Sequence, residues 1–185
     1  FNYEILDKSN NKSIMDLGIA QVITDDDNLD LPKKTTLNNK TSDFVGFLNI
    51  NLTNNLNLGY DFSIDNSFSH TNYDFITAEM KVNNLVTSFE FLKEDNVYGA
   101  KSYLSNQTTL KINENNFISF KQRENLEQDI TEFYNLIYEY KNNCLTASIE
   151  YNKDYYKDVN LDPEENLFFK IKLIPLGVIS SPTIN

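Results

Sequence analysis

The side chains with the most distinctive chemistry in this chain are one cysteine, Cys144, and one histidine, His70. They lie far apart in the sequence, and nucleophilic catalysis needs a nucleophile beside an activating base. No glycine-rich phosphate-binding loop is present either. Without a nearby cysteine or a second histidine, His70 is a poor candidate metal ligand. We therefore expect no enzyme activity, no cofactor and no metal site.

The acidic run Asp25-Asp26-Asp27 is a second place where chemistry could be sought. A calcium loop of the EF-hand type carries oxygen ligands at alternate positions, a central glycine and a terminal glutamate. Here Leu29 occupies the third ligand position, and no glycine follows it. The ordinary interpretation of this run is a solvated loop.

Other carboxylates fall in segments where apolar and polar residues alternate. In residues 56–65, leucine, tyrosine, phenylalanine and isoleucine alternate with asparagine, glycine, serine and aspartate. A period of two indicates a β-strand with one apolar and one polar face. The pattern recurs between short, often asparagine-rich turns, and it predicts strands at 1–6, 14–24, 43–53, 56–65, 72–82, 85–93, 97–112, 117–123, 134–141, 144–152 and 167–174.

This organisation predicts an all-β fold, an antiparallel up-and-down meander of about eleven strands that is part of a large transmembrane outer-membrane β-barrel. Strands of about 9–11 residues are long enough to cross a bilayer when tilted. Tyrosines cluster near strand ends, where a ring can sit at the level of the lipid headgroups. A soluble antiparallel sandwich also alternates and stays an alternative. A barrel would leave Leu58, Phe62 and Ile149 facing lipid, whereas a sandwich would bury them.

Charged residues on the polar faces would then line a water-filled lumen, because a charge facing lipid is costly. A hydrated barrel wall explains these charged residues more simply than a catalytic acid–base pair would. The lysines expected on this wall are Lys81, Lys170 and Lys172. The carboxylates expected on it are Asp61, Asp65, Glu79, Glu90, Glu139 and Glu150.

The composition of the chain excludes further classes of function. The 185 residues carry a net charge of -11, which argues against nucleic-acid binding, since that binding requires a basic surface. No apolar run is long enough for a transmembrane helix. Because no signal peptide opens the chain although an outer-membrane protein needs one, we expect a fragment of a longer protein.

The connections between the predicted strands alternate in length. Barrels of this kind place short turns in the periplasm and longer loops outside. The C-terminus would then be periplasmic, with Pro175 ending the last strand. Periplasmic turns are expected at 54–55, 83–84, 113–115 and 142–143, and external loops at 25–42, 66–71, 124–130 and 154–165.

The C-terminal quarter also carries a family resemblance. The segments YNLIYEY (134–140), Cys144 with LTASIEY to 151, YYKDVNLDP (155–163) and NLFFKIKLIPLG (166–177) resemble, in this order, the end of the LPS-assembly protein LptD family. Earlier segments at 17–23, 41–50 and 56–65 look like barrel strands of the same family, the last more loosely. The resemblance implies residues 1–177 as the C-terminal part of a transmembrane barrel, with 178–185 as a short periplasmic tail.

The resemblance implies roles for two further parts of the chain. In the family, cysteines at the place of Cys144, often an adjacent pair, bond to cysteines of the N-terminal periplasmic domain. Here Asn143 and Leu145 flank a single cysteine, so any bridge must reach outside this chain; a buried, unpaired thiol is the alternative. The family's barrel opens laterally between its first and last strands. The edge of that gate would be Leu167, Phe168, Phe169, Lys170, Ile171, Lys172 and Leu173.

The implied function is lipopolysaccharide assembly and translocation into the outer leaflet of the bacterial outer membrane. The implied partners are lipopolysaccharide, an LptE-like plug lipoprotein, outer-membrane lipid, and the periplasmic lipopolysaccharide-transport bridge, reached through a missing N-terminal domain. Two alternatives stay open: a generic outer-membrane porin or receptor fragment, and a soluble, secreted β-rich binding module.

Overall fold

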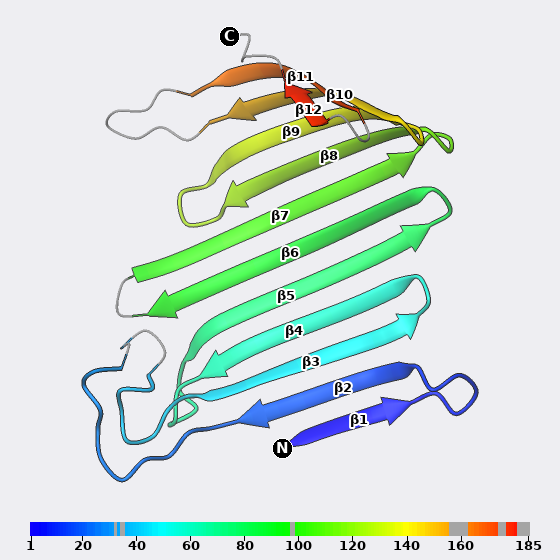
Figure 1. The fold of residues 1–185 in the computed structure, drawn as a ribbon. Helices are drawn as coiled ribbons and strands as arrows, with labels where there is room; N and C mark the ends of the chain where they lie inside the picture. Colours follow the sequence, from blue (N-terminus) through cyan, green and yellow to red (C-terminus); the bar gives the residue numbers. More distant parts are fainter. Residues whose placement is uncertain (32, 34–35, 97–98, 156–162, 174–176, 181–185) are drawn as a thin grey trace. The chain divides into compact units, whose positions relative to one another are not determined.

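The computed structural model describes residues 1–185 except 32, 34–35, 97–98, 156–162, 174–176 and 181–185. Within this part the chain forms twelve β-strands and almost no helix (Figure 1). No helix there has the length and hydrophobicity needed to cross a membrane. The strands are β1 (Asn2–Leu6), β2 (Ser13–Ala20), β3 (Phe44–Thr53), β4 (Leu56–Ile64), β5 (Thr71–Val82), β6 (Leu85–Asn96), β7 (Gly99–Lys111), β8 (Asn116–Asn125), β9 (Ile130–Lys141), β10 (Leu145–Asp154), β11 (Glu165–Leu173) and β12 (Gly177–Ser180).

The strands form one antiparallel meander in which the order along the sheet follows the order along the chain. The predicted all-β meander is thus confirmed, and the sheet is not closed among the described residues. The eleven predicted strands correspond to β1–β11. Sequence analysis did not predict β12, which lies in the range expected as a tail. The expected effect of Pro175 falls outside the described residues.

The chain divides into two compact units. The N-terminal unit comprises Phe1–Glu79 and Glu90–Tyr103, and the C-terminal unit comprises Met80–Phe89 and Leu104–Asn185. The division passes through β5, β6 and β7, so each unit holds parts of these three strands.

The N-terminal unit has one apolar and one polar face, because residues paired across antiparallel strands project to the same side. Leu17 pairs with Leu48, which pairs with Tyr60 in the next strand. On the opposite side of the sheet, Asp16, which precedes Leu17, pairs with Asn49, which follows Leu48. We call these sides the apolar face and the polar face. Some apolar side chains, such as Val45 and Phe47, also lie on the polar face.

The C-terminal unit repeats this arrangement. Ile118 pairs with Tyr138, which pairs with Ile149, and Ile149 pairs with Phe169. The residues between them are mostly polar. Four strands therefore present one continuous apolar row to one side.

Neither unit covers its apolar face. None of the hydrophobic side chains in the described residues is buried, and Leu58 and Ile149 are 36% and 47% exposed. Phe62 is half-buried. The described part of the chain therefore has no hydrophobic core of the kind that holds a soluble sandwich together.

Asparagine side chains build the short turns. Asn142 Oδ1 accepts hydrogen bonds from the backbone N–H groups of Cys144 and Leu145, at 2.9 and 2.8 Å. Asn113 Oδ1 likewise accepts hydrogen bonds from the backbone N–H groups of Asn115 and Asn116. Asn83 adopts a positive φ of 51°. These are the local hydrogen bonds and the left-handed conformation that asparagine tolerates in tight turns. The short turns therefore lie where the sequence predicts them.

Two glycines allow aromatic rings to lie flat across neighbouring strands. A Cβ atom on Gly18 would collide with the ring of Phe47, and one on Gly46 would collide with the ring of Phe62. The two rings lie on opposite faces of the sheet, since Phe47 pairs with Gly18 and Phe62 pairs with Gly46.

The long connection between β2 and β3 is more ordered than its lack of periodicity suggests. The predicted strand 14–24 ends at Ala20, and the chain then folds into a hydrogen-bonded loop closed by a bridge between Ile23 and Thr41. Ser42 is buried there, accepting a hydrogen bond from Val22 N and donating one to the Asp43 carbonyl. Backbone pairing between the two arms of the loop and side-chain hydrogen bonds, such as those of Ser42, together organise this segment.

Candidate functional site

The exposed apolar faces are the most extensive candidate functional surfaces. In the N-terminal unit, β1, β2, β4 and β5 contribute exposed apolar side chains: Tyr3, Ile5, Ile19, Leu58 and Ile76. In the C-terminal unit, β9, β10 and β11 contribute Leu136, Tyr138, Ile149, Leu167, Phe169 and Leu173. Contiguous apolar surface of this kind marks contact with a partner or with lipid.

Polar side chains on the apolar faces bond to one another. In the N-terminal unit, the hydroxyl of Tyr60 donates to Asp74 Oδ1 at 2.6 Å. In the C-terminal unit, Thr87 and Thr108 share a hydrogen bond of 2.7 Å, and Asn106 Nδ2 donates to Thr87 at 3.2 Å. Mutual hydrogen bonding lowers the cost of placing such groups in an apolar environment.

The polar face of the N-terminal unit carries several of the predicted carboxylates. Asp61 lies there, paired with Phe47. Glu79 lies on the same side, because Asn57 Nδ2 donates to it at 3.4 Å. Glu90 in β6 projects to the opposite side from its neighbours Phe89 and Phe91. Asp16 has an oxygen that is shielded from solvent without a hydrogen-bond partner in the described structure.

Asp65 differs from the prediction. It was expected on the lumen-facing side of a strand, but it follows the end of β4 and caps the β4–β5 turn. Its carboxylate accepts hydrogen bonds from the backbone N–H groups of Ser69 and His70 at 2.7 and 2.9 Å, and from the hydroxyl of Ser67. These bonds hold the pKa of Asp65 well below its usual range, the Ser67 hydroxyl contributing most. Asp65 therefore stabilises a turn, because a local carboxylate–backbone network outcompetes strand continuation.

Asp7 has the same function in the turn between β1 and β2. Its Oδ1 accepts hydrogen bonds from the backbone N–H and the hydroxyl of Ser9, at 2.9 and 2.8 Å. The backbone bond is the largest cause that lowers the pKa of Asp7. Both turns thus depend on an ionised aspartate.

On the polar face of the C-terminal unit, Glu150 has both a neutral donor and a cation as partners. Glu150 accepts a hydrogen bond from Asn135 Nδ2 at 2.9 Å and lies 3.4 Å from Lys170 Nζ. Glu139 is opposite Phe117 in β8 and Ser148 in β10. Glu139 and Glu150 therefore lie on one face, as the alternation predicts.

A buried polar cluster at the ends of β8 and β9 was not found from the sequence. Glu132 is only 7% exposed, accepts a hydrogen bond from Asn125 and pairs with Arg123. Asn125 also accepts bonds from the backbone N–H groups of Glu127 and Gln128, both 3.1 Å. The cluster closes this hairpin. The one feature of the sequence that could have pointed to this cluster is Arg123, the single arginine of the chain, which follows a run of alternating residues.

The predicted gate strand, Leu167, Phe168, Phe169, Lys170, Ile171, Lys172 and Leu173, lies entirely within β11. One edge of β11 pairs with β10 over its whole length, from Glu165 to Leu173. The other edge pairs with β12 over Lys170–Leu173. Among the described strands the end position therefore belongs to β12, and β11 has an open edge only in its N-terminal half. Its role at a gate stays a prediction.

Cys144 lies in the turn between β9 and β10, is exposed, and forms no disulfide. It borders a surface hollow of about 670 Å³ together with Lys141, Phe117 and Glu114. An exposed thiol is accessible to a cysteine of another polypeptide, as the disulfide hypothesis requires.

His70 and the acidic run offer little for metal chemistry. His70 Nε2 lies 3.3 Å from Asp95 Oδ2. In the acidic run, Asp27 Oδ1 accepts a hydrogen bond from Lys40 N at 2.6 Å, which orders the β2–β3 loop. Over the residues that the structure describes, no group of three or more His, Cys, Asp or Glu side chains is arranged to hold a metal ion.

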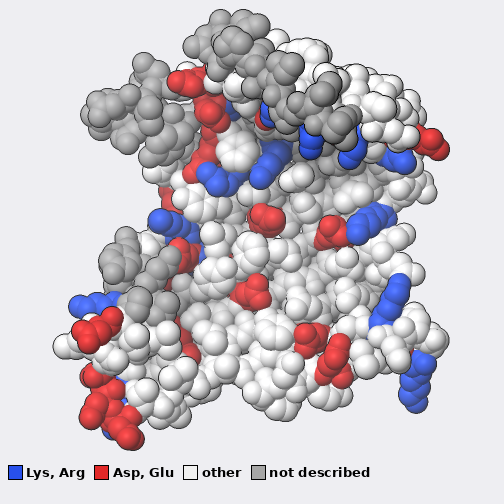
Figure 2. Space-filling model, viewed as in Figure 1, with Lys and Arg blue, Asp and Glu red and all other residues white. Residues whose placement is uncertain are grey.

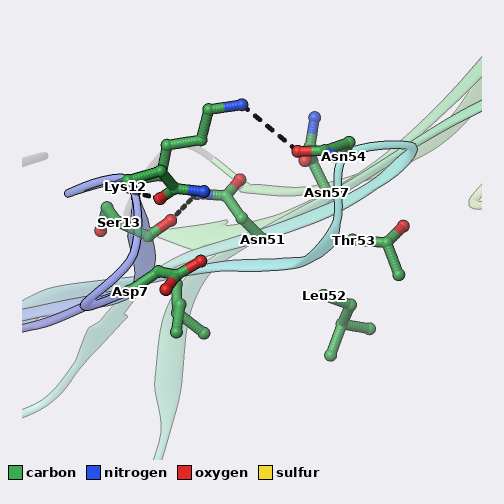
Figure 3. Close-up of a pocket in the computed structure, with 10 residues that line it drawn as sticks. Asp7, Lys12, Ser13, Asn51, Leu52, Thr53, Asn54 and Asn57 are labelled. Atoms are coloured by element: carbon green, nitrogen blue, oxygen red, sulfur yellow. Dashed lines mark hydrogen bonds between the residues drawn. The ribbon is translucent and has the colours of Figure 1, made fainter.

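A polar hollow of about 610 Å³ lies between the β1–β2 and β3–β4 turns (Figure 3). Lys12 Nζ reaches across it and donates to Asn54 Oδ1 at 3.3 Å. Asn51 Nδ2 donates to the carbonyl oxygen of Ser13 at 2.8 Å. These contacts connect the two hairpins at their turn ends.

Comparison with known proteins adds no relative. No protein-family model matches the chain, and a search of curated proteins finds no significant match.

Proposed function

We propose that this sheet is part of a transmembrane β-barrel of the bacterial outer membrane, with its apolar face toward lipid and its polar face toward a water-filled lumen. The observation that carries the proposal is the exposed apolar row, together with the absence of buried hydrophobic side chains among the residues that the structure describes. A bilayer removes such a row from water, whereas an isolated sheet in water cannot. Strands of 9–13 residues from β3 to β11 are long enough to cross the hydrocarbon layer.

Within that setting, we propose a role in lipopolysaccharide assembly. The support is the resemblance of residues 134–177 to the LptD family, described above. On this proposal the chain acts with an LptE-like plug lipoprotein, and Cys144 forms a disulfide with a periplasmic segment outside this chain. The exposure of Cys144 is compatible with such a bond.

Partition between buffer and detergent tests the membrane proposal. The chain is refolded with and without detergent micelles, and strand content is followed by far-ultraviolet circular dichroism. We expect folded, monodisperse protein only in micelles, because they cover the apolar faces. A monomer that is well folded in plain buffer would instead support the soluble β-rich module.

The assembly role needs a separate experiment on the full-length protein in its native membrane. We expect a plug lipoprotein to co-purify with it, and lipopolysaccharide to accumulate inside the cell on its depletion. A protein that purifies without such a partner, and whose depletion changes only small-solute permeability, would support the porin alternative.

A further inference from the structure

The chain carries a net charge of -11, yet one row of the C-terminal unit concentrates cations. Lys141 in β9 pairs with Thr146 in β10, and Thr146 pairs with Lys172 in β11. The three side chains therefore project from the polar face in one line across three strands. In Figure 2, lysine and arginine side chains gather over the region of β8 to β11.

The geometry of this row suits an anion. Adjacent strands are about 4.8 Å apart, which places the two lysine backbones about 10 Å from each other with the threonine between them. Lys141 and Lys172 are exposed, and Thr146 is half-buried. Two flexible ammonium groups can therefore converge on a group that the central hydroxyl also contacts.

Neither lysine forms an ion pair with any residue that the structure describes, unlike Arg123, Lys153 and Lys170. Lys170, two residues closer to the middle of β11, forms an ion pair with Glu150 at 3.4 Å. Two carboxylates could compete for these lysines: Glu139, on the same face of β9, and Glu114, which lies between β7 and β8 and borders the hollow beside Lys141.

We propose that Lys141, Thr146 and Lys172 bind a phosphate group. A phosphate monoester carries nearly two negative charges at neutral pH and three strong acceptor oxygens. It can therefore accept from both ammonium groups and the hydroxyl at once, through charge-assisted hydrogen bonds. The proposal goes beyond the proposed function and does not rest on the membrane location, because the row is defined by strand register alone.

The test uses the full chain in detergent micelles, with backbone amide NMR during titration with inorganic phosphate. We expect saturable shifts centred on Thr146 and its neighbours, with a Kd on the order of 1 mM. Lys141→Gln and Lys172→Gln should each weaken binding about tenfold, the loss of one charge-assisted contact. Thr146→Val, which keeps the side-chain shape, should weaken it less, and Lys172→Arg should retain it.

Lys170→Gln is the matched control, since Lys170 lies on the same face but is already paired with Glu150. Lys12→Gln controls for the loss of one charge elsewhere. An equal loss of affinity in Lys170→Gln would show a general field effect and overturn the proposal, as would unchanged binding in Lys141→Gln and Lys172→Gln. Far-ultraviolet circular dichroism confirms that each variant is folded.

A second titration identifies the source of the phosphate group. Short-chain phosphatidic acid that binds much more tightly than inorganic phosphate would identify a lipid headgroup, and equal affinities would identify the phosphate alone. The absence of saturable shifts with both probes in folded protein would overturn the proposal, while leaving the membrane proposal to its own partition test.

Discussion

The two units share one pattern of apolar and polar faces, but they satisfy their carboxylates by different means. In the C-terminal unit, Glu132 pairs with Arg123 and Glu150 with Lys170. In the N-terminal unit, the buried carboxylate of Asp43 accepts hydrogen bonds only from neutral donors, the Ser63 hydroxyl at 2.9 Å and the Asn72 amide at 2.7 Å.

This difference has consequences for the charge of each polar face. Neutral donors leave the carboxylate's negative charge in place, so the N-terminal unit stays acidic, whereas ion pairs cancel charge. In the C-terminal unit Lys141 and Lys172 form no ion pair with the described residues, while the neighbouring Glu150 is paired with Lys170. The same strand pattern can thus support two kinds of polar face.

The largest effect is expected from a charge placed on the shared apolar face. Ile149→Lys and Leu58→Lys should each destabilise the protein by about 2–4 kcal/mol in vesicles if these positions lie near the bilayer midplane. Ser148→Lys, one residue away on the polar face, should change stability by less than about 1 kcal/mol. The measurement is urea-induced unfolding from phospholipid vesicles.

Equal costs at Leu58 and Ile149 would show that the two units share one environment. A cost for Ser148→Lys as large as that for Ile149→Lys would contradict the assignment of faces.

A smaller effect should separate the two ways of satisfying carboxylates. Glu132→Gln should cost about 2 kcal/mol, because the Arg123 guanidinium loses its partner, and added salt should reduce that cost. Asp43→Asn should cost about 1 kcal/mol with little dependence on salt, since the amide oxygen can still accept from neutral donors. Denaturant unfolding at low and high salt measures both variants. The same salt dependence in both would remove the distinction between the units.

The smallest effect concerns pH and the turn at Asp65. Because the pKa of Asp65 is lowered in the folded state, its ionised form stabilises the fold at pH values above its unfolded pKa of about 3.9. This stabilisation is lost as the pH falls below that value through the folded pKa. Carboxyl carbon NMR should show Asp65 still ionised at pH 3, and Asp65→Asn should remove its share of the acid sensitivity. Titration of Asp65 near pH 4 would contradict the turn network.

Much of the fold could be predicted from period-two patterns. Strands from β3 to β11 begin and end within about four residues of the predicted ranges, because alternation and asparagine turns are local signals. The prediction was wrong where side chains compete with strand pairing. Asp65 caps a turn instead of continuing β4, and the strand predicted to reach Thr24 ends at Ala20, where Ser42 and Asp43 organise a loop.

The sequence by itself determined which residues share a face within each strand, since side chains alternate whatever the neighbouring strand is. It placed Glu139 and Glu150 on one side and Ile149 on the other. Only the tertiary structure decided which residues meet across strands. Register places Lys170 beside Glu150 and leaves Lys141 and Lys172 on either side of Thr146, and a slip of one residue would have moved each side chain to the opposite face.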